Sequence, residues 1–210
     1  MKNLFFAAVL YLAFSAIPTA AQTTTLPKPN MNRRTPSVMQ TFAQRKSDRS
    51  FSNRNIDRQT LSDLLWCAQG KNREDGKLTT PTCRNWQEIR LYVFDNRGVS
   101  LYDPQAHSLQ QVARGDHRKL VAGSQEWAAE APICIVLVND LDKPQKYDER
   151  AREMTAVDVG ICTQNICLAC AAFGLATVPR ASMDREGIRK LLKLSENQQP
   201  IMNNPVGYAK

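Results

Sequence analysis

Apolar positions along this chain recur at helical spacing in some stretches and run without interruption in others. The segment 58–69 carries leucines at helical spacing and is followed by Gly70, which predicts a helix that ends at Gln69. Upstream, Thr35 is placed to cap another helix with Pro36 at its first position, and apolar positions 38, 39 and 42 would then share one face. Both segments are predicted to be amphipathic helices.

The middle of the chain predicts strands as well as helices. Residues 89–94 and 99–102 are expected to form two strands that turn back through Asn96-Arg97-Gly98, and a helix is expected around 118–130. The apolar run 133–138 predicts a buried strand. Three elements are expected further on: a strand near 176–178, a helix near 184–192 and a final strand. The order of elements is typical of an α+β protein.

The longest predicted helix spans about 149–173, and its second half, 156–173, is apolar nearly all round. Such a helix must be buried on several sides, so it is either a central core helix or part of a subunit interface. Asp158, near its middle, is expected to cap or pair within the fold rather than to catalyse. Gln164 and Asn165 are expected to be structural, because buried amides must find hydrogen-bonding partners.

The N-terminus has the pattern of a secretory signal peptide over residues 1–21. One cation, Lys2, precedes an apolar run, and Pro18 and small residues follow. We therefore expect an exported protein, periplasmic or secreted, with no stable membrane anchor. Residues 22–34 are expected to be a linker or arm, and residues 35–210 a single domain.

Charge adds a preference for an anionic partner. The chain has 28 Lys and Arg against 20 Asp and Glu, and removal of residues 1–21 takes away one cation, which leaves 27 against 20, or +7. The cations are scattered and show no nucleic-acid-binding spacing, so nucleic acid is not expected as a partner. Six cysteines would suit disulfides in an exported chain, but Cys162, Cys167 and Cys170 share one helical stretch and are expected to pack as small apolar groups. With only two histidines, no metal site is expected.

The segment Arg45-Lys46-Ser47-Asp48-Arg49-Ser50-Phe51 places three cations and a hydroxyl within five residues, directly after a predicted helix. Arginine offers a planar fork of donors that matches a phosphate, and Ser47 adds a neutral donor from the same turn. The alternative is a solvated charged helix end.

Three later motifs stand in a fixed order with this segment. They are Pro81-Thr82-Cys83-Arg84-Asn85-Trp86-Gln87 in a long polar loop, Gln164-Asn165 in the apolar helix, and Pro205-Val206-Gly207-Tyr208-Ala209-Lys210 at the end. Together they resemble the nitroreductase family of FMN-dependent oxidoreductases from about Pro36 onward, and its compact branch related to thiazoline and oxazoline dehydrogenases in particular. The resemblance implies an α+β nitroreductase-like fold, with a central, mostly antiparallel sheet flanked by helices, in an intertwined homodimer.

The resemblance also implies roles for residues around FMN. Arg45 and Ser47 would hold the phosphate or ribityl region, and Arg49 would lie near the N1 and O2 edge of the ring. Lys46 matches a position that is often basic in the family, but its side chain could equally point to solvent. Asn85 would contact the flavin through its amide, with a loop-capping role as the alternative.

The segment Thr177-Val178-Pro179-Arg180-Ala181-Ser182 resembles the one that passes the reactive N5 and donates a backbone N–H to it, so Pro179 and Ala181 are expected at the cofactor. Ala181 and Ser182 replace a common Glu-Gly pair, which leaves substrate preference open. Lys210 would lie near the phosphate. No residue stands out as a catalytic acid or base, which fits chemistry performed by the cofactor.

The activity implied is flavin-mediated two-electron reduction of a small conjugated or nitroaromatic acceptor. The electron donor would be NAD(P)H, a quinol or a redox protein, and export favours the latter two because nicotinamide nucleotides are cytosolic. Two alternatives remain: a flavin-dependent dehydrogenase of the azoline type, and a flavin-binding protein without turnover.

Overall fold

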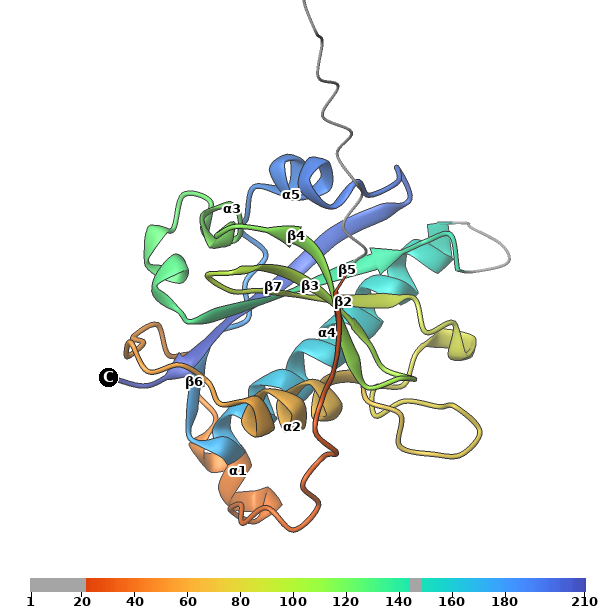
Figure 1. Cartoon of the computed structure of the whole chain (residues 1–210). Coiled ribbons are helices and arrows are strands. Elements are labelled where there is room, and N and C mark those ends of the chain that lie inside the picture. The colour runs from red at the N-terminus through yellow and green to blue at the C-terminus, as the bar shows by residue number, and fades with distance from the viewer. Residues whose placement is uncertain (1–21, 144–148) are drawn as a thin grey trace, which may run out of the picture.

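The computed structural model describes residues 22–143 and 149–210, so the predicted signal peptide lies outside the described residues. Seven strands form one sheet in the order β1-β4-β3-β2-β5-β7-β6, and every pair is antiparallel (Figure 1). The strands are β1 (Thr23–Thr25), β2 (Ile89–Phe94), β3 (Gly98–Asp103), β4 (Ser108–Arg114), β5 (Ile133–Asp140), β6 (Leu175–Thr177) and β7 (Gln198–Tyr208). The expected α+β fold with a mostly antiparallel sheet is confirmed.

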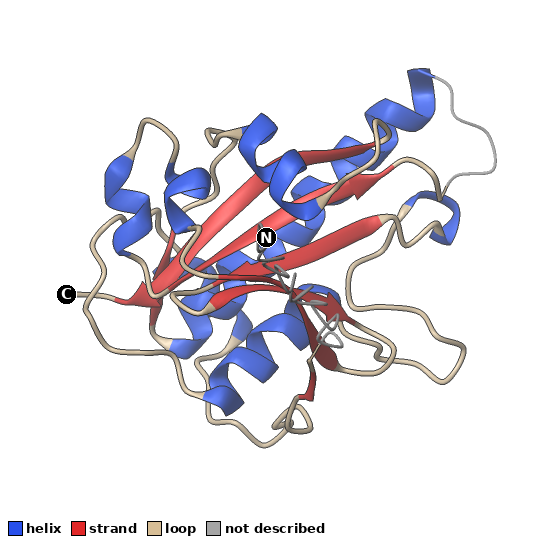
Figure 2. Ribbon diagram, turned by 45° about the horizontal axis from the view of Figure 1, so that its top comes forward, coloured by secondary structure: helices blue, strands red, loops and turns tan. Residues whose placement is uncertain are grey.

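Helices cover both faces of this sheet (Figure 2). The helices are α1 (Val38–Gln44), α2 (Arg58–Gln69), α3 (Arg118–Ala122), α4 (Glu149–Phe173) and α5 (Arg185–Leu192), with short 3-10 turns η1 (Cys83–Asn85) and η2 (Glu126–Glu130). Strand β5 is buried along its whole length, because Ile135 and Leu137 face the core beneath α2 and α4 while Val136 and Val138 face the core beneath α3 and α5. A strand buried on both faces has an uninterrupted apolar sequence.

Helix α4 is the central helix on one side of the sheet, and it packs against α2, α1 and β7. Its inner face includes Val159, Cys162 and Ile166, which are fully buried, whereas Val157 and Ile161 on its other side are exposed. Within the described part of the chain, α4 alone is long and apolar enough to span a membrane by length and composition, a property that the core helix of a soluble protein shares. The sequence of α4 is therefore apolar all round because one face packs in the core and the opposite face is apolar but exposed.

Several predicted elements are found as expected, among them the helices at 58–69 and 149–173 and the strand at 89–94. The start of α1 differs: Ser37, not Thr35, is the N-cap, because its side chain accepts the N–H of Gln40 while Gln40 bonds back to the backbone of Ser37. The helix expected over 118–130 is broken at Gly123, whose φ of +57° ends α3.

The segment 22–34, expected to be a linker or arm, lies against the domain. Thr23–Thr25 pairs with β4 as an edge strand, and Leu26 is buried in the core. Further along, the backbone N–H of Asn30 donates to Asp63 on α2 over 2.8 Å.

Candidate functional site

The basic segment begins where α1 ends. Arg45 is the C-cap, and its backbone N–H donates to Thr41. The side chain of Arg45 is half-buried and has no ion pair within the described ranges, whereas the exposed Lys46 lies 3.2 Å from Asp48. The backbone N–H of Asp48 donates to the carbonyl of Thr177 over 2.9 Å, which fastens the segment to β6. Arg45 is therefore the cation of this turn that remains available to an anion.

The segment next crosses the end of β7, and the crossing requires a glycine. Phe51 is buried and bridges to Ala209, and its ring stacks on that of Trp127 with centroids 6.4 Å apart. A Cβ on Gly207 would lie 2.6 Å from the ring of Pro132 and 3.3 Å from that of Phe51. The close approach brings the basic segment, η2 and the C-terminal strand together.

A cavity of about 330 Å³ lies at this junction, and three of the predicted residues line it: Arg49, Pro179 and Ala181. Trp127 forms part of its wall, and the Arg49 guanidinium lies 5.9 Å from the centre of that ring. Lys210 is exposed, and its Nζ lies 3.6 Å from Glu130, which belongs to the same 3-10 turn as Trp127.

Arg180 also lines this cavity, and sequence reasoning assigned it no role. Its side chain is buried and donates to neutral acceptors only: Gln125 Oε1, Asn203 Oδ1 and the carbonyls of Val121 and Ala122. Burial lowers the pKa of this guanidinium, but an arginine remains charged at any physiological pH. No carboxylate of the described residues pairs with it, so its positive charge is not neutralised within the site.

A second hollow, of about 210 Å³, lies beside the basic segment and is lined by Lys46, Cys167 and Thr177 among others. Asn204 projects from β7 toward this region, where its Nδ2 donates to Thr177 Oγ1 over 3.3 Å while its buried Oδ1 has no partner. Burial raises the pKa of the Cys167 thiol. The positive charge of the nearby Arg45 guanidinium offsets part of this rise. Ser47 follows Lys46 in the basic segment and is exposed.

The cysteines of α4 are buried free thiols. Cys162 and Cys170 are fully buried, and burial raises the pKa of Cys162 to about 12. A thiol with so high a pKa is almost never the reactive thiolate. The absence of disulfides from this helix remains a prediction.

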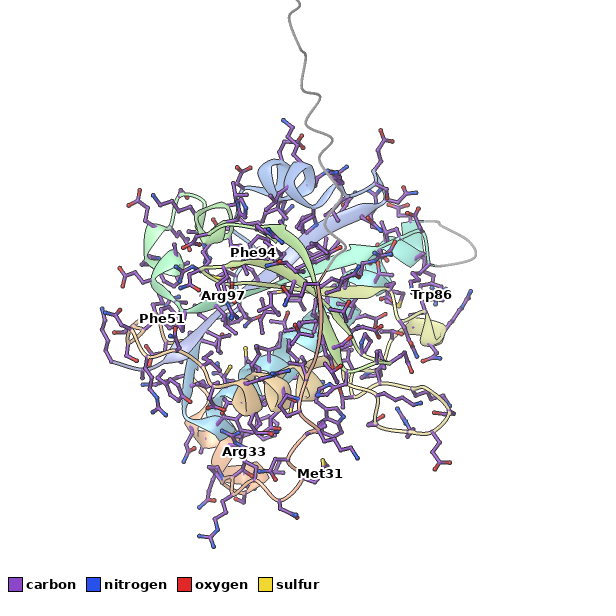
Figure 3. All side chains as sticks on the ribbon, in the orientation of Figure 1. Met31, Arg33, Phe51, Trp86, Phe94 and Arg97 are labelled. Atoms are coloured by element: carbon purple, nitrogen blue, oxygen red, sulfur yellow. The ribbon has the colours of Figure 1, made fainter. Side chains whose placement is uncertain are left out.

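Asn85 lies elsewhere. It belongs to η1, where its Oδ1 accepts from Gln87 Nε2 over 3.3 Å, and the neighbouring Cys83 N–H donates to Asp158. Asp158 and Cys167 are nine residues apart on α4, which places them roughly 14 Å apart along the helix axis. Trp86 and Phe51 accordingly appear on opposite sides of the molecule (Figure 3). One subunit therefore does not bring Asn85 to the basic segment.

The loop around Asn85 is strained. Arg84, Asn85 and Gln87 have φ values of 51°, 55° and 51°. These values lie in the left-handed region of backbone conformation, which residues other than glycine rarely adopt. Each such residue costs of order 1 kcal/mol, so neighbouring contacts must hold the loop.

A further cavity, of about 580 Å³, was not anticipated from the sequence. It lies between the segment 29–36, α1, α2 and the second half of α4, and its wall includes Phe42, Trp66 and Phe173. The apolar residues of α1 were a signal for it, because Val38 and Phe42 are exposed rather than packed against the core and line this cavity.

The residues present fit a flavin with a phosphate group. Arg49 and Arg180 line the cavity beside Pro179, no carboxylate of the described residues pairs with either of them, and Trp127 forms an aromatic wall. Arg45, on the same basic segment as Arg49, also has no ion pair among the described residues. An anionic, planar, conjugated ligand matches this combination of cations and aromatic surface. This combination of fold and cationic cavity is typical of a flavin-dependent oxidoreductase.

Comparison with known proteins gives the same class. The model of the nitroreductase family matches residues 42–208. A protein of Methanocaldococcus jannaschii, described as a candidate nitroreductase, is 28% identical over 173 residues, covering 78% of this chain and 86% of that protein. The crystal structure of a candidate nitroreductase from Ralstonia eutropha JMP134 is 30% identical, covers 93% of each chain and has a TM-score of 0.82. The chain therefore belongs to the nitroreductase family.

A more distant structure shares the fold. A nitroreductase family protein from Clostridium difficile 630 is 22% identical, with a TM-score of 0.62 over 83% of this chain and 86% of that one.

Proposed function

We propose that this protein is an exported, homodimeric, FMN-dependent oxidoreductase that reduces a small conjugated or nitroaromatic acceptor by two electrons. The observation that carries the proposal is a cavity with an aromatic wall, Trp127, and two cations, Arg49 and Arg180, that have no carboxylate partner among the described residues. FMN, when bound, supplies the hydride and electron transfer. Export rests on the sequence of residues 1–21 and favours a quinol or a redox protein as the electron donor over NAD(P)H.

The protein residues position and polarise the cofactor. Arg45 and Ser47 bind the phosphate, because the half-buried guanidinium of Arg45 gains charge-assisted hydrogen bonds that no neighbouring carboxylate competes for. Arg49 and Arg180 place positive charge at the cavity, which favours the negative charge that a flavin ring acquires on reduction. The segment from Pro179 to Ala181 offers the backbone N–H of Ala181, an exposed residue of the cavity lining, to the ring.

A second copy of the chain completes the site. Met39 and Phe42 on α1 and Val157 and Ile161 on α4 are apolar and exposed, and one molecule offers them no cover. Apolar surface of this kind marks an interface between subunits. A dimer through these helices would bring the Asn85 loop of one copy toward the basic segment of the other, which reconciles the predicted cofactor role of Asn85 with its distance from Arg45.

Mixed dimers test the shared site. Arg45→Ala and Asn85→Ala chains, carrying different affinity tags, are co-expressed, and the dimers that carry both tags are purified. If each site takes Arg45 from one subunit and Asn85 from the other, the mixed dimer keeps one intact site and binds FMN at about half the wild-type content, while both variant homodimers bind weakly. If each subunit holds its own site, every site in the mixed dimer is damaged.

The bound cofactor is identified by chromatography after denaturation. Haem or FAD in place of FMN, or a folded protein that takes up no flavin at all, would refute the assignment. Reduction by candidate donors then separates an enzyme from a flavin carrier.

A further inference from the structure

The loop that carries Asn85 is tied to α4 ahead of its strained residues, where Asn165 Nδ2 donates to Thr80 Oγ1 over 3.0 Å, and again at Cys83. Asp158 Oδ2 accepts the backbone N–H of Cys83 over 2.7 Å. A second bond, from the N–H of Gln87 to Thr82 Oγ1, stays within the loop. The position of Asn85 relative to the rest of the protein therefore depends on the state of Asp158.

Glu88 follows the loop directly, and its side chain is wholly buried. Neither of its carboxylate oxygens has a hydrogen-bonding partner within the described part of the molecule, and its backbone carbonyl accepts the N–H of Asp140. An ionised carboxylate in such a place would lack the hydrogen bonds that offset the loss of water, so the neutral acid is the stable form.

The groups that face Glu88 support this state. Asp158 approaches from α4 and disfavours a second negative charge, and Cys162 on the same helix is a neutral thiol. Lys143, after β5, is exposed and favours ionisation, while Arg90 on β2 is already paired with Asp140. Burial first, and then Asp158, raise the pKa of Glu88 to about 8.

We propose that Glu88 and Asp158 share one proton and that this proton holds the Asn85 loop in place. Glu88 has no donor and so carries the proton, while Asp158 accepts both the Glu88 hydroxyl and the Cys83 N–H. When the proton leaves, two buried carboxylates face each other, and their repulsion moves Asp158 away from Cys83. The strained backbone of Arg84, Asn85 and Gln87 then relaxes. Glu88 and Asp158 are thus positioning residues that act through the backbone of Cys83.

Hydrogen exchange of the purified mature protein measures this lock. The amides of residues 82–87 are followed from pH 6 to 9, with rates corrected for the intrinsic pH dependence. The protection of the Cys83 N–H should fall by up to about tenfold per pH unit until about pH 8 and then level off, because opening exposes a carboxyl group that releases its proton. In Glu88→Gln the amide donates to Asp158 at every pH, so the slope should vanish while protection persists.

Matched variants separate the shared proton from general effects of pH. Glu74→Gln removes an exposed carboxylate from the same long loop and should keep the wild-type slope. Asp158→Asn removes the charged acceptor and should lower protection at all pH values. A wild-type protein without the slope, or a Glu88→Gln protein that retains it, would overturn the proposal.

A measurement on the wild type alone covers the case in which a variant does not fold. Infrared spectroscopy at pH 7 should show the C=O band of a protonated carboxyl group that disappears as the pH rises through about 8; a spectrum without it would equally refute the shared proton. The importance of the lock for cofactor binding rests on the proposed function. Exchange is therefore recorded with and without added FMN, so that a missing slope and a failure to bind FMN are distinguishable.

Discussion

Two buried ionisable groups on opposite sides of the sheet have opposite surroundings. Beside α3, the buried guanidinium of Arg180 donates four hydrogen bonds, two of them to the last carbonyls of α3. Beside α4, the buried carboxyl of Glu88 receives no hydrogen bond from the described residues. A buried ion is stable only where hydrogen bonds replace its water, so Arg180 remains charged whereas Glu88 holds its proton.

The charge on Arg180 is therefore independent of pH, whereas the contact between Glu88 and Asp158 depends on it. The charge on Arg180 is present at every physiological pH and acts on whatever occupies the neighbouring cavity. The Glu88–Asp158 pair responds to pH and acts on the backbone of one loop. In the proposed site, the charge beside the cavity is thus constant, whereas the position of the Asn85 loop depends on pH.

Removal of Arg180 should produce the largest effect. Arg180→Leu leaves the carbonyls of Val121 and Ala122 and two side-chain oxygens without donors, and each buried unpaired group costs about 1–3 kcal/mol. We expect the free energy of unfolding, measured in urea, to fall by at least about 3 kcal/mol. Arg185→Leu, at an exposed position, should change it by less than about 0.5 kcal/mol. Similar values for the two variants would contradict the contrast between the surroundings of Arg180 and those of Glu88.

The pH dependence of stability should reveal Glu88. The folded protein holds a proton that the unfolded chain releases above its ordinary pKa of about 4.5, and the folded pKa is about 8. Stability from this group is therefore complete below about pH 4.5 and is lost as the pH rises to 8, by up to about 1.4 kcal/mol per pH unit. Urea unfolding between pH 5 and 8 measures this slope, which Glu88→Gln should flatten. An unchanged slope would show that other groups cause it.

Arg45 and Lys46 should differ in FMN binding. The loss of one or two charge-assisted bonds in Arg45→Ala should weaken FMN binding by roughly tenfold to several hundredfold. Lys46→Ala should cost little, because Lys46 is exposed and paired with Asp48. Fluorescence quenching gives the dissociation constants, and riboflavin, which lacks the phosphate, is the control. An equal loss for riboflavin and FMN in Arg45→Ala would show that Arg45 supports the fold instead of the phosphate.

The sequence was sufficient for the local elements. Leucine spacing and Gly70 defined α2, and the uninterrupted apolar run identified β5, because these signals depend on neighbours in the chain. The start of α1 was placed too early, since a capping box depends on the side-chain bond between Ser37 and Gln40, and Thr35 looked equally suitable.

The site was only partly predictable. Pattern matching found Arg49, Pro179 and Ala181, which the fold does bring to one cavity. It could not find Trp127 or Arg180, because nothing in their local sequence shows that α3, η2 and β7 converge there. Glu88 was missed for a related reason: an acid beside a polar loop looks exposed until the contact of the loop with Asp158 on α4, about 70 residues away, is known.

Only a small effect on stability is expected at Arg49, which shares the cavity with Arg180 but is exposed. Its guanidinium lies 5.9 Å from the Trp127 ring, a contact worth at most about 1 kcal/mol at an exposed site. Arg49→Ala should therefore unfold within about 1 kcal/mol of the wild type and yet weaken FMN binding. Arg54→Ala is the matched control, since Arg54 is equally exposed and its guanidinium lies 4.0 Å from the Tyr208 ring, outside the cavity lining. It should share the small change in stability and leave FMN binding intact. If Arg49→Ala instead destabilised the protein as much as Arg180→Leu, Arg49 would be a structural cation as well, and the assignment of its charge to the cofactor would fail.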